Sequence, residues 1–184
     1  MTRKITTIVA LVMLCMAATG TVWAASAFEP LAPGAVSPQS DGMVGAAEYP
    51  WHATIGDMQL WLSLSADSST LHVALRAPAT GWAAVGLGSV KMNGAFMVLG
   101  YDDKGKQAVS EQTGVMFGHK ENKNAVLLHS AVLEKDGATI LEFSLPAAGY
   151  LSSGSLKMIV AYGKQDNFTS RHAKYAAAEV PLKK

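Results

Sequence analysis

The chain has 184 residues, 49% of them hydrophobic and 16% charged, and its formal net charge at pH 7 is +1. This length supports one hydrophobic core and therefore one domain. A charge so close to zero excludes an electrostatic affinity for nucleic acid or for an anionic membrane surface. The single cysteine, Cys15, excludes a disulfide framework.

The first 27 residues are typical of a secretory signal peptide. Arg3 and Lys4 provide a positive start, and residues 5–16 form an almost unbroken apolar stretch. Small residues then allow cleavage after Ala24 or Ala27. The protein is therefore predicted to be exported, either periplasmic or secreted, with no stable membrane insertion after cleavage.

Two other interpretations of this segment are a transmembrane anchor and a lipoprotein anchor on Cys15. The apolar run is of marginal length, and Gly20 and Thr21 weaken a helix there, which favours cleavage. Met13 and Leu14 lack the small residue that a lipoprotein signal needs just before its cysteine. Cleavage removes Cys15 and two of the 15 basic residues, so 13 basic residues remain against 14 acidic ones and no thiolate is left.

Residues 28–40 contain three prolines and little periodic apolar pattern, which predicts a linker before a domain of residues 41–184. In that domain, short apolar or alternating runs are separated by turn signals, and none repeats at helical spacing. The runs cover residues 60–64, 71–76, 82–87, 96–101, 126–133, 139–145 and 157–162, with turns at 67–69, 102–105, 135–137 and 152–154. This spacing predicts an all-β domain, an antiparallel sandwich or barrel.

Motifs for hydrolysis or group transfer are absent from the sequence. It has no Gly-x-Ser-x-Gly, no phosphate-binding glycine loop and no His-Glu-x-x-His, and its five histidines never pair at close metal-ligand spacing. His72 and His129 lie in strand-like runs, where a histidine is more often exposed or hydrogen-bonded than a metal ligand. The chain is therefore predicted not to be an enzyme acting alone.

Two segments carry a more specific pattern. Residues 81–101 read Gly-Trp-Ala-Ala-Val-Gly-Leu-Gly-Ser-Val-Lys-Met-Asn-Gly-Ala-Phe-Met-Val-Leu-Gly-Tyr, and residues 159–163 read Ile-Val-Ala-Tyr-Gly, with His172 after eight more residues. Together with Asp41-Gly42 and Glu48-Tyr49 upstream, this order resembles the DOMON family. Within that family it resembles the haem-binding branch that includes the cytochrome domain of cellobiose dehydrogenase. The resemblance covers residues 41–182.

The resemblance implies an immunoglobulin-like β-sandwich that binds haem b without a covalent bond. Haem-binding members place a methionine just before the Gly-Ala strand and a histidine after the late strand. Those positions correspond to Met92 and His172, which are 80 residues apart. A thioether and an imidazole on the two axial positions leave no open site on the iron, which suits electron transfer. The implied partner is a membrane diheme cytochrome or a soluble oxidoreductase.

Further residues are expected to shape the haem pocket. Gly94 and Ala95 would let the porphyrin approach the backbone closely, because a larger side chain would take its place. Tyr162 is expected to line the pocket with Met97 and Phe96.

Other ligands remain open on the sequence alone. Some related redox subunits use lysine opposite methionine, so Lys164 or Lys174 is an alternative to His172. His129 and His52 are further candidates if the turn geometry differs. The candidates for pairing with haem propionates are Arg171, Lys174 and Lys91.

The DOMON family also contains modules without haem that bind carbohydrate or another small ligand. The aromatic side chains that would stack on a sugar ring are Trp51, Trp61 and Trp82. A structural or assembly protein, tethered by the proline-containing segment, is a third hypothesis, without positive support in the sequence.

Overall fold

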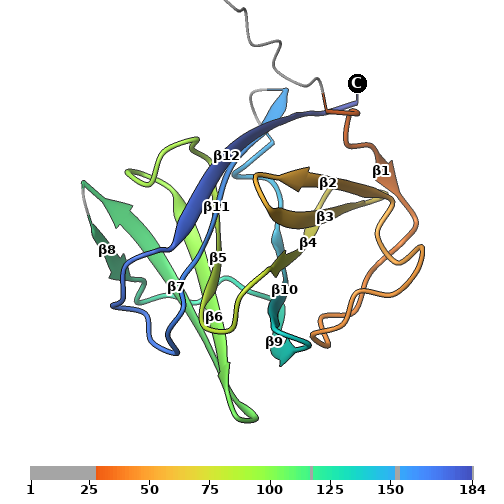
Figure 1. Ribbon diagram of the computed structural model, residues 1–184. Coiled ribbons are helices and arrows are strands. Elements are labelled where there is room, and N and C mark those ends of the chain that lie inside the picture. Colours follow the sequence, from red (N-terminus) through yellow and green to blue (C-terminus); the bar gives the residue numbers. More distant parts are fainter. Residues whose placement is uncertain (1–27, 117, 152–153, 184) are drawn as a thin grey trace, which may run out of the picture.

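The computed structural model describes residues 28–116, 118–151 and 154–183 (Figure 1). The predicted signal peptide, with Cys15 and both cleavage positions, lies outside the described residues. The described chain consists of strands joined by turns and loops, so the prediction of an all-β protein is confirmed. No helix in this part of the chain is long and apolar enough to cross a membrane.

Six of the described strands form the first sheet, in the order β1-β3-β4-β10-β9, with β2 also paired to β3. Their bounds are β1 Pro33–Gly34, β2 Trp51–Ile55, β3 Met58–Ser65, β4 Thr70–Ala77, β9 His129–Lys135 and β10 Ala138–Pro146. β1 runs parallel to β3, whereas the other neighbours in this sheet are antiparallel.

The second sheet has the order β12-β11-β5-β6-β7-β8, with antiparallel neighbours throughout. Its strands are β5 Ala83–Leu87, β6 Phe96–Asp103, β7 Lys106–Val115, β8 Gly118–Glu121, β11 Ser155–Tyr162 and β12 Lys174–Pro181. The two sheets pack face to face, which confirms the predicted sandwich (Figure 1).

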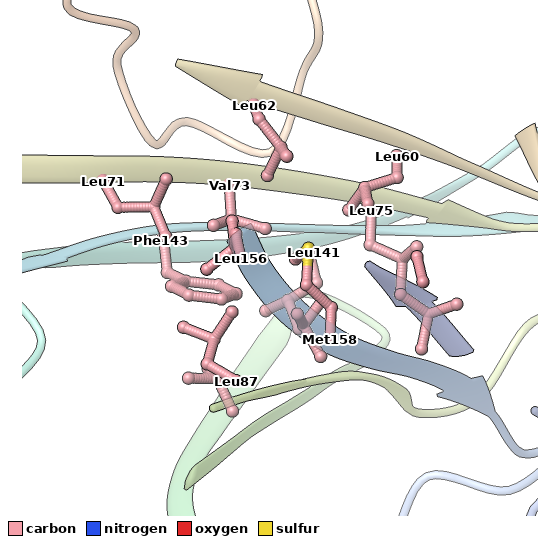
Figure 2. Packing of buried hydrophobic residues seen from close by; sticks show 14 of the residues in the cluster. Leu60, Leu62, Leu71, Val73, Leu75, Leu87, Leu141, Phe143, Leu156 and Met158 are labelled. Carbon is pink, nitrogen blue, oxygen red and sulfur yellow. The ribbon is translucent and has the colours of Figure 1, made fainter. Parts of the chain in front are cut away.

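The core lies between the two sheets because alternate residues of each strand point to the same side. Figure 2 shows Leu71 and Val73 of β4 directed towards Leu87 of β5, with Phe143 of β10 between them. Phe143 and Leu87 are fully buried. The apolar residues that alternate along the strands therefore meet in a single core between the two sheets.

Two of the predicted turns are two-residue hairpins. Lys104 and Gly105 join β6 to β7 with φ of 55° and 88°, and Asp136 and Gly137 join β9 to β10 with φ of 52° and 73°. Positive φ at both residues is the type I′ geometry, whose twist matches that of the flanking strands.

The proline-containing segment predicted to be a linker lies against the sandwich. Leu31 is 1% exposed and belongs to the core. Its amide donates to the carbonyl of Pro181 at 2.8 Å, and its carbonyl accepts from the amide of Lys183 at 2.8 Å. Residues 28–40 thus join the end of the chain to the edge of the first sheet.

A buried carboxylate holds the next part of this segment. Glu142 of β10 is fully buried on the outer face of the first sheet. Its Oε2 accepts hydrogen bonds from the amides of Asp41, Gly42 and Met43 at 3.1, 2.7 and 3.0 Å, and its Oε1 accepts from the Tyr49 hydroxyl at 2.8 Å. Burial raises the pKa of Glu142, and these hydrogen bonds oppose the shift by favouring the ionised form.

The same face carries a buried histidine. His72 of β4 is 8% exposed, and its Nδ1 has no hydrogen-bond partner among the described residues. The ring bonds to the backbone of Pro38, which offers only a carbonyl, so the neutral ring donates from Nε2. Burial lowers the pKa of His72, and the charge of nearby His129 lowers it further.

This environment makes the stability of the fold depend on pH. His72 takes up a proton less readily in the folded protein than in the unfolded chain. Above the ordinary histidine pKa of about 6.5 the ring is neutral in both states, so this difference does not reduce the stability of the fold there. We expect stability to fall as the pH drops below that value, and His72→Gln to flatten this part of the profile. Urea unfolding at pH 7.5 and 5.5 measures it, with exposed His52→Gln as the control. Equal acid losses in the wild type and in His72→Gln would contradict the assignment.

Candidate functional site

The second sheet buries apolar side chains on its outer face as well as towards the core. In β5, Ala83 and Val85 belong to the core, whereas Ala84 points the other way. The outer cluster of buried residues consists of Trp82, Ala84, Ala95, Met97 and Leu99, with Met92, Tyr101, Ile159, Ala161 and Phe168 packed against it. We call this surface the outer apolar face. An open sheet face is more often polar, so a second buried apolar cluster distinguishes this face from an ordinary solvent-facing one.

Met92 borders this face from the loop between β5 and β6. Its side chain is partly buried against the cluster, and its carbonyl accepts from the amide of Ala95 at 3.0 Å. Gly94 turns the loop with φ of 80°, and its amide donates to the carbonyl of Gly114 at 2.9 Å. The loop therefore rests directly on β7.

His172 lies at the opposite edge of the second sheet, just before β12. Its exposed ring packs edge-on against Tyr175, with ring centroids 4.9 Å apart. It also lines an open cleft of about 620 Å³. The remaining residues around the cleft are Gly56, Asp57, Met58, Arg171, Ala173, Lys174 and Tyr175.

The strand register relates the two candidate ligands. Tyr175 lies opposite Ala161, Ala161 opposite Ala84, and Ala84 opposite Leu99. Residues directly opposite each other on neighbouring strands share a face, so Tyr175 lies on the same side of the sheet as the outer apolar face. Tyr175 is 70% exposed and is not part of that cluster. The structure does not bring the two candidate ligands together. Met92 follows the Leu87 end of β5, whereas His172 follows Tyr162, which pairs with Ala83 at the other end of β5.

The other predicted pocket residues divide between the two faces. Ala95 is fully buried in the outer cluster with Met97. Phe96 packs against the core, and Tyr162 is a core residue, so both face away from Met92. The backbone carbonyl of Tyr162 nevertheless accepts from the amide of Ala173 at 2.7 Å and so fixes the chain beside His172.

The alternative ligands have other surroundings. Lys174 forms an ion pair with Asp57 at 2.6 Å, and Asp57 Oδ2 also accepts from the Tyr162 hydroxyl at 3.0 Å. The hydrogen bond from Lys174 lowers the pKa of Asp57 and raises that of Lys174 itself, so the ammonium group is held protonated. His52 and His129 lie on the first sheet, in β2 and β9.

Three contacts had no local signal in the sequence. At the candidate site, Gly114 lies under the Met92 loop and Ser170 bonds to the indole of Trp82 at 2.9 Å, and on the first sheet Glu142 holds the Asp41-Gly42 turn. Each contact joins segments far apart in the chain. Within the described residues, no group of three or more His, Cys, Asp or Glu side chains is arranged to hold a metal ion.

The fold belongs to the class of β-sandwiches found in cytochrome domains. The cytochrome domain of cellobiose dehydrogenase from Myriococcum thermophilum matches with a TM-score of 0.54 and 12% identity, over 68% of this chain and 75% of that chain. The cytochrome b domain of pyranose dehydrogenase from Coprinopsis cinerea matches with a TM-score of 0.52 and 14% identity, over 68% and 76%. At these identities the likeness is one of fold. It confirms the resemblance to the cytochrome-type fold expected from the sequence.

No family model matches the sequence, and no curated protein matches it either.

Proposed function

We propose that this protein binds haem b non-covalently at the outer apolar face and carries single electrons outside the cytoplasm. The observation that supports the proposal is the likeness of the fold to cytochrome domains. Met92 contacts the outer apolar face of this sandwich, and His172 lies at the opposite end of the same sheet. The predicted signal peptide supports a periplasmic or secreted location.

The donor types of Met92 and His172 fit the chemistry of this group, but the structure holds the two side chains at opposite ends of β5. A thioether and an imidazole form a low-spin axial pair, and both side chains are at least partly accessible. Ala84, Ala161 and Met97 supply small or flexible apolar side chains. Ala84 and Met97 are only 5% and 6% exposed, so a planar ring would have to displace the side chains that cover them. Arg171 and Lys91 are exposed beside the two ligand positions and are available to pair with propionates.

Haem b held in this way supplies a one-electron couple without an open coordination position. The chain's own residues then supply binding and orientation, and Met92 raises the potential relative to a second histidine. Met92 and His172 would hold the group together only if the Met92 loop and the segment that carries His172 moved towards each other, since they lie at opposite ends of β5. The proposed partner is a redox protein, such as a membrane diheme cytochrome or a soluble oxidoreductase.

Haemin titration with absorption spectroscopy tests the proposal. The wild type is expected to give a sharp, reducible low-spin spectrum, which Met92→Leu and His172→Gln lose because each removes one axial donor. Met92→His is expected to keep the low-spin spectrum but lower the midpoint potential, since a second imidazole replaces the thioether.

Matched controls come from the first sheet and its lead-in. His129→Gln and Met43→Leu remove the same donor types from exposed positions and are expected to leave the spectrum unchanged. A wild-type protein that remains colourless in haemin would overturn the proposal.

In the described part of the chain, the contacts of Trp51 and Trp82 do not favour the carbohydrate-binding alternative, and Trp61 is partly buried. Trp51 and Trp82 are each 6% exposed, and their indole N–H groups donate to the carbonyl of Glu29 and the hydroxyl of Ser170. Neither ring is therefore presented to a sugar.

A further inference from the structure

The corner of the second sheet beside Met92 contains a histidine that belongs to no motif in the sequence. His119 of β8 is the strand partner of Gly114 in β7. Gly114 lies two residues after Gln112, which is the strand partner of Met97 in the outer apolar face. Side chains two residues apart on a strand point to the same side, so His119 lies on the side of the sheet that carries Met97.

Met92 reaches the same corner from the loop between β5 and β6. A Cβ on Gly114 would lie 3.2 Å from Met92 Cγ, so the methionine side chain lies over this glycine. Directly paired residues of antiparallel strands have Cα atoms about 4.5–5.5 Å apart. The thioether of Met92 and the imidazole of His119 therefore both lie next to Gly114, which has no side chain to separate them.

A second thioether lies at this corner. Met116 is in the turn between β7 and β8 and is 70% exposed. Its amide donates to Asn93 Oδ1 at 2.8 Å, which joins the turn to the residue after Met92. Figure 1 shows the end of β7 and the Met92 loop at the same end of the second sheet. We call the group formed by Met92, Met116 and His119 the Met/His corner.

The ring of His119 is held in one orientation. Its Nδ1 is bonded to Gln112 Oε1, and Nε2 of the same amide donates to Ser110 Oγ at 3.0 Å. Gln112 and Ser110 are 6% and 9% exposed, so the amide that holds the ring is itself buried. An amide oxygen only accepts, so Nδ1 carries the proton and Nε2 keeps its lone pair in the neutral ring. A histidine that binds a metal is usually oriented in this way, through its other ring nitrogen.

The donor types at the Met/His corner favour one class of metal. Thioether sulfur is a soft ligand that selects Cu(I), and imidazole also binds copper, whereas Ca²⁺ and Mg²⁺ take oxygen ligands. Within the described residues, no group of three or more His, Cys, Asp or Glu side chains could hold a metal ion, so Zn²⁺ would lack its usual ligands here. Cu(I) accepts a low coordination number and has no such need.

From these contacts we propose that the protein binds a Cu(I) ion at the Met/His corner, through the sulfur atoms of Met92 and Met116 and Nε2 of His119. Met92 is partly buried and the other two residues are exposed, so the ion reaches the donor atoms without displacing the buried cluster. Methionine has a flexible side chain that can adapt to the ion. The site needs neither haem nor any movement of His172, although copper and haem would exclude each other at the sulfur of Met92.

Anaerobic titration with Cu(I), in competition with a coloured Cu(I) chelator and in the presence of ascorbate, tests the site. The wild type is expected to take Cu(I) from the chelator. Met92→Leu, Met116→Leu and His119→Gln are expected to lose this ability because each removes one donor atom. Leucine keeps the apolar volume of methionine, and glutamine keeps an N–H group for Gln112. X-ray absorption should also show sulfur bound to the copper.

A change at Gln112 tests the orientation of the ring. Gln112→Leu removes the acceptor of His119 Nδ1 and is expected to weaken Cu(I) affinity about 10- to 100-fold, the usual cost of losing such a partner. Gln112→Glu keeps an oxygen acceptor and should bind Cu(I) more tightly than Gln112→Leu. Equal affinity of the wild type and Gln112→Leu would contradict the role of this bond.

The controls remove the same donor types elsewhere. His129→Gln and Met43→Leu change exposed residues of the first sheet and its lead-in and should bind Cu(I) as the wild type does. His172→Gln, which is expected to lose the haemin spectrum, should also keep its Cu(I) affinity. An equal loss in the control variants would overturn the site, because the binding would then not depend on the Met/His corner.

The outcomes separate this inference from the proposed function. A wild type that takes no Cu(I) from the chelator, or that binds copper without sulfur, would overturn the copper site and leave haem binding untouched. Undiminished binding in Met92→Leu and His119→Gln would overturn it as well. A wild type that binds Cu(I) but stays colourless in haemin would overturn the proposed function alone.

Discussion

Replacing Gly114 with alanine is expected to displace the Met92 loop. We expect the variant to bind haemin more weakly and to have a lower free energy of unfolding. A Cβ at this position would lie 1.7 Å from the carbonyl oxygen of Met92 and 2.6 Å from its carbonyl carbon. Both are backbone atoms, so no change of rotamer relieves the overlap. The loop must move, which strains its two hydrogen bonds to Gly114.

We expect Gly114→Ala to reduce the free energy of unfolding by about 1–3 kcal/mol, the usual range for overpacking. Urea unfolding measures the stability, and haemin titration measures whether displacement of the Met92 loop lowers haemin affinity. Gly34→Ala is the control, because a Cβ there would meet no atom of the described residues within 4 Å. A Gly114→Ala protein with wild-type stability and a wild-type spectrum would show that Met92 does not depend on this contact.

Glu142→Ala is expected to release residues 36–49 from the first sheet. The variant leaves the amides of Asp41, Gly42 and Met43 without their buried acceptor. Gly42 has φ of 87°, and a Cβ there would lie 2.8 Å from Leu133 Cβ, so the turn fits the sheet only in its present form. Hydrogen bonds to a charged group contribute about 1.5–3 kcal/mol each, so we expect a loss of about 3 kcal/mol or more.

Two milder variants are expected to lose less stability than Glu142→Ala. Tyr49→Phe removes one bond to the carboxylate and is expected to cost about 1 kcal/mol. Glu142→Gln can keep its carbonyl on the three amides and donate its NH₂ to Tyr49, so it should lie between the wild type and Glu142→Ala. Urea unfolding measures the stability of each variant and so ranks them. Limited proteolysis should cut Glu142→Ala first within residues 36–49, the segment that the variant releases. Equal stability of the Gln and Ala variants would contradict the role of the carboxylate as an acceptor.

The strands that sequence analysis predicted are those with an apolar side. Residues 71–76, 96–101 and 139–145 fall within β4, β6 and β10 because alternation with period two marks a half-buried strand. It missed β1, β2, β7, β8 and β12. β8 is exposed along its whole length and obtains its order from backbone pairing, which leaves no apolar signal. β2 does carry a short alternation, since Trp51 and Ile55 are buried in the core, but that run was not identified as a strand.

For the candidate site, the sequence predicted the two proposed donors, Met92 and His172, and the small residues beside Met92. The motif singled out Met92, Gly94, Ala95 and His172, and alternation in 157–162 set neighbouring side chains on opposite faces. It did not determine which face belongs to the core. The sequence therefore left open whether Tyr162 lies with Met92, and packing turned Tyr162 inward while Ala161 faces the outer cluster.

The tertiary structure alone decided the contacts between distant segments. Glu142 reads as one polar residue in an alternating strand, yet it is the buried acceptor for a turn about 100 residues earlier. Ser170 reads as part of a polar stretch, yet it bonds to an indole 88 residues away. Local pattern determines the direction of each side chain relative to its own strand. The partner it meets depends on how the sheets stack and where the loops cross them, which no local pattern contains.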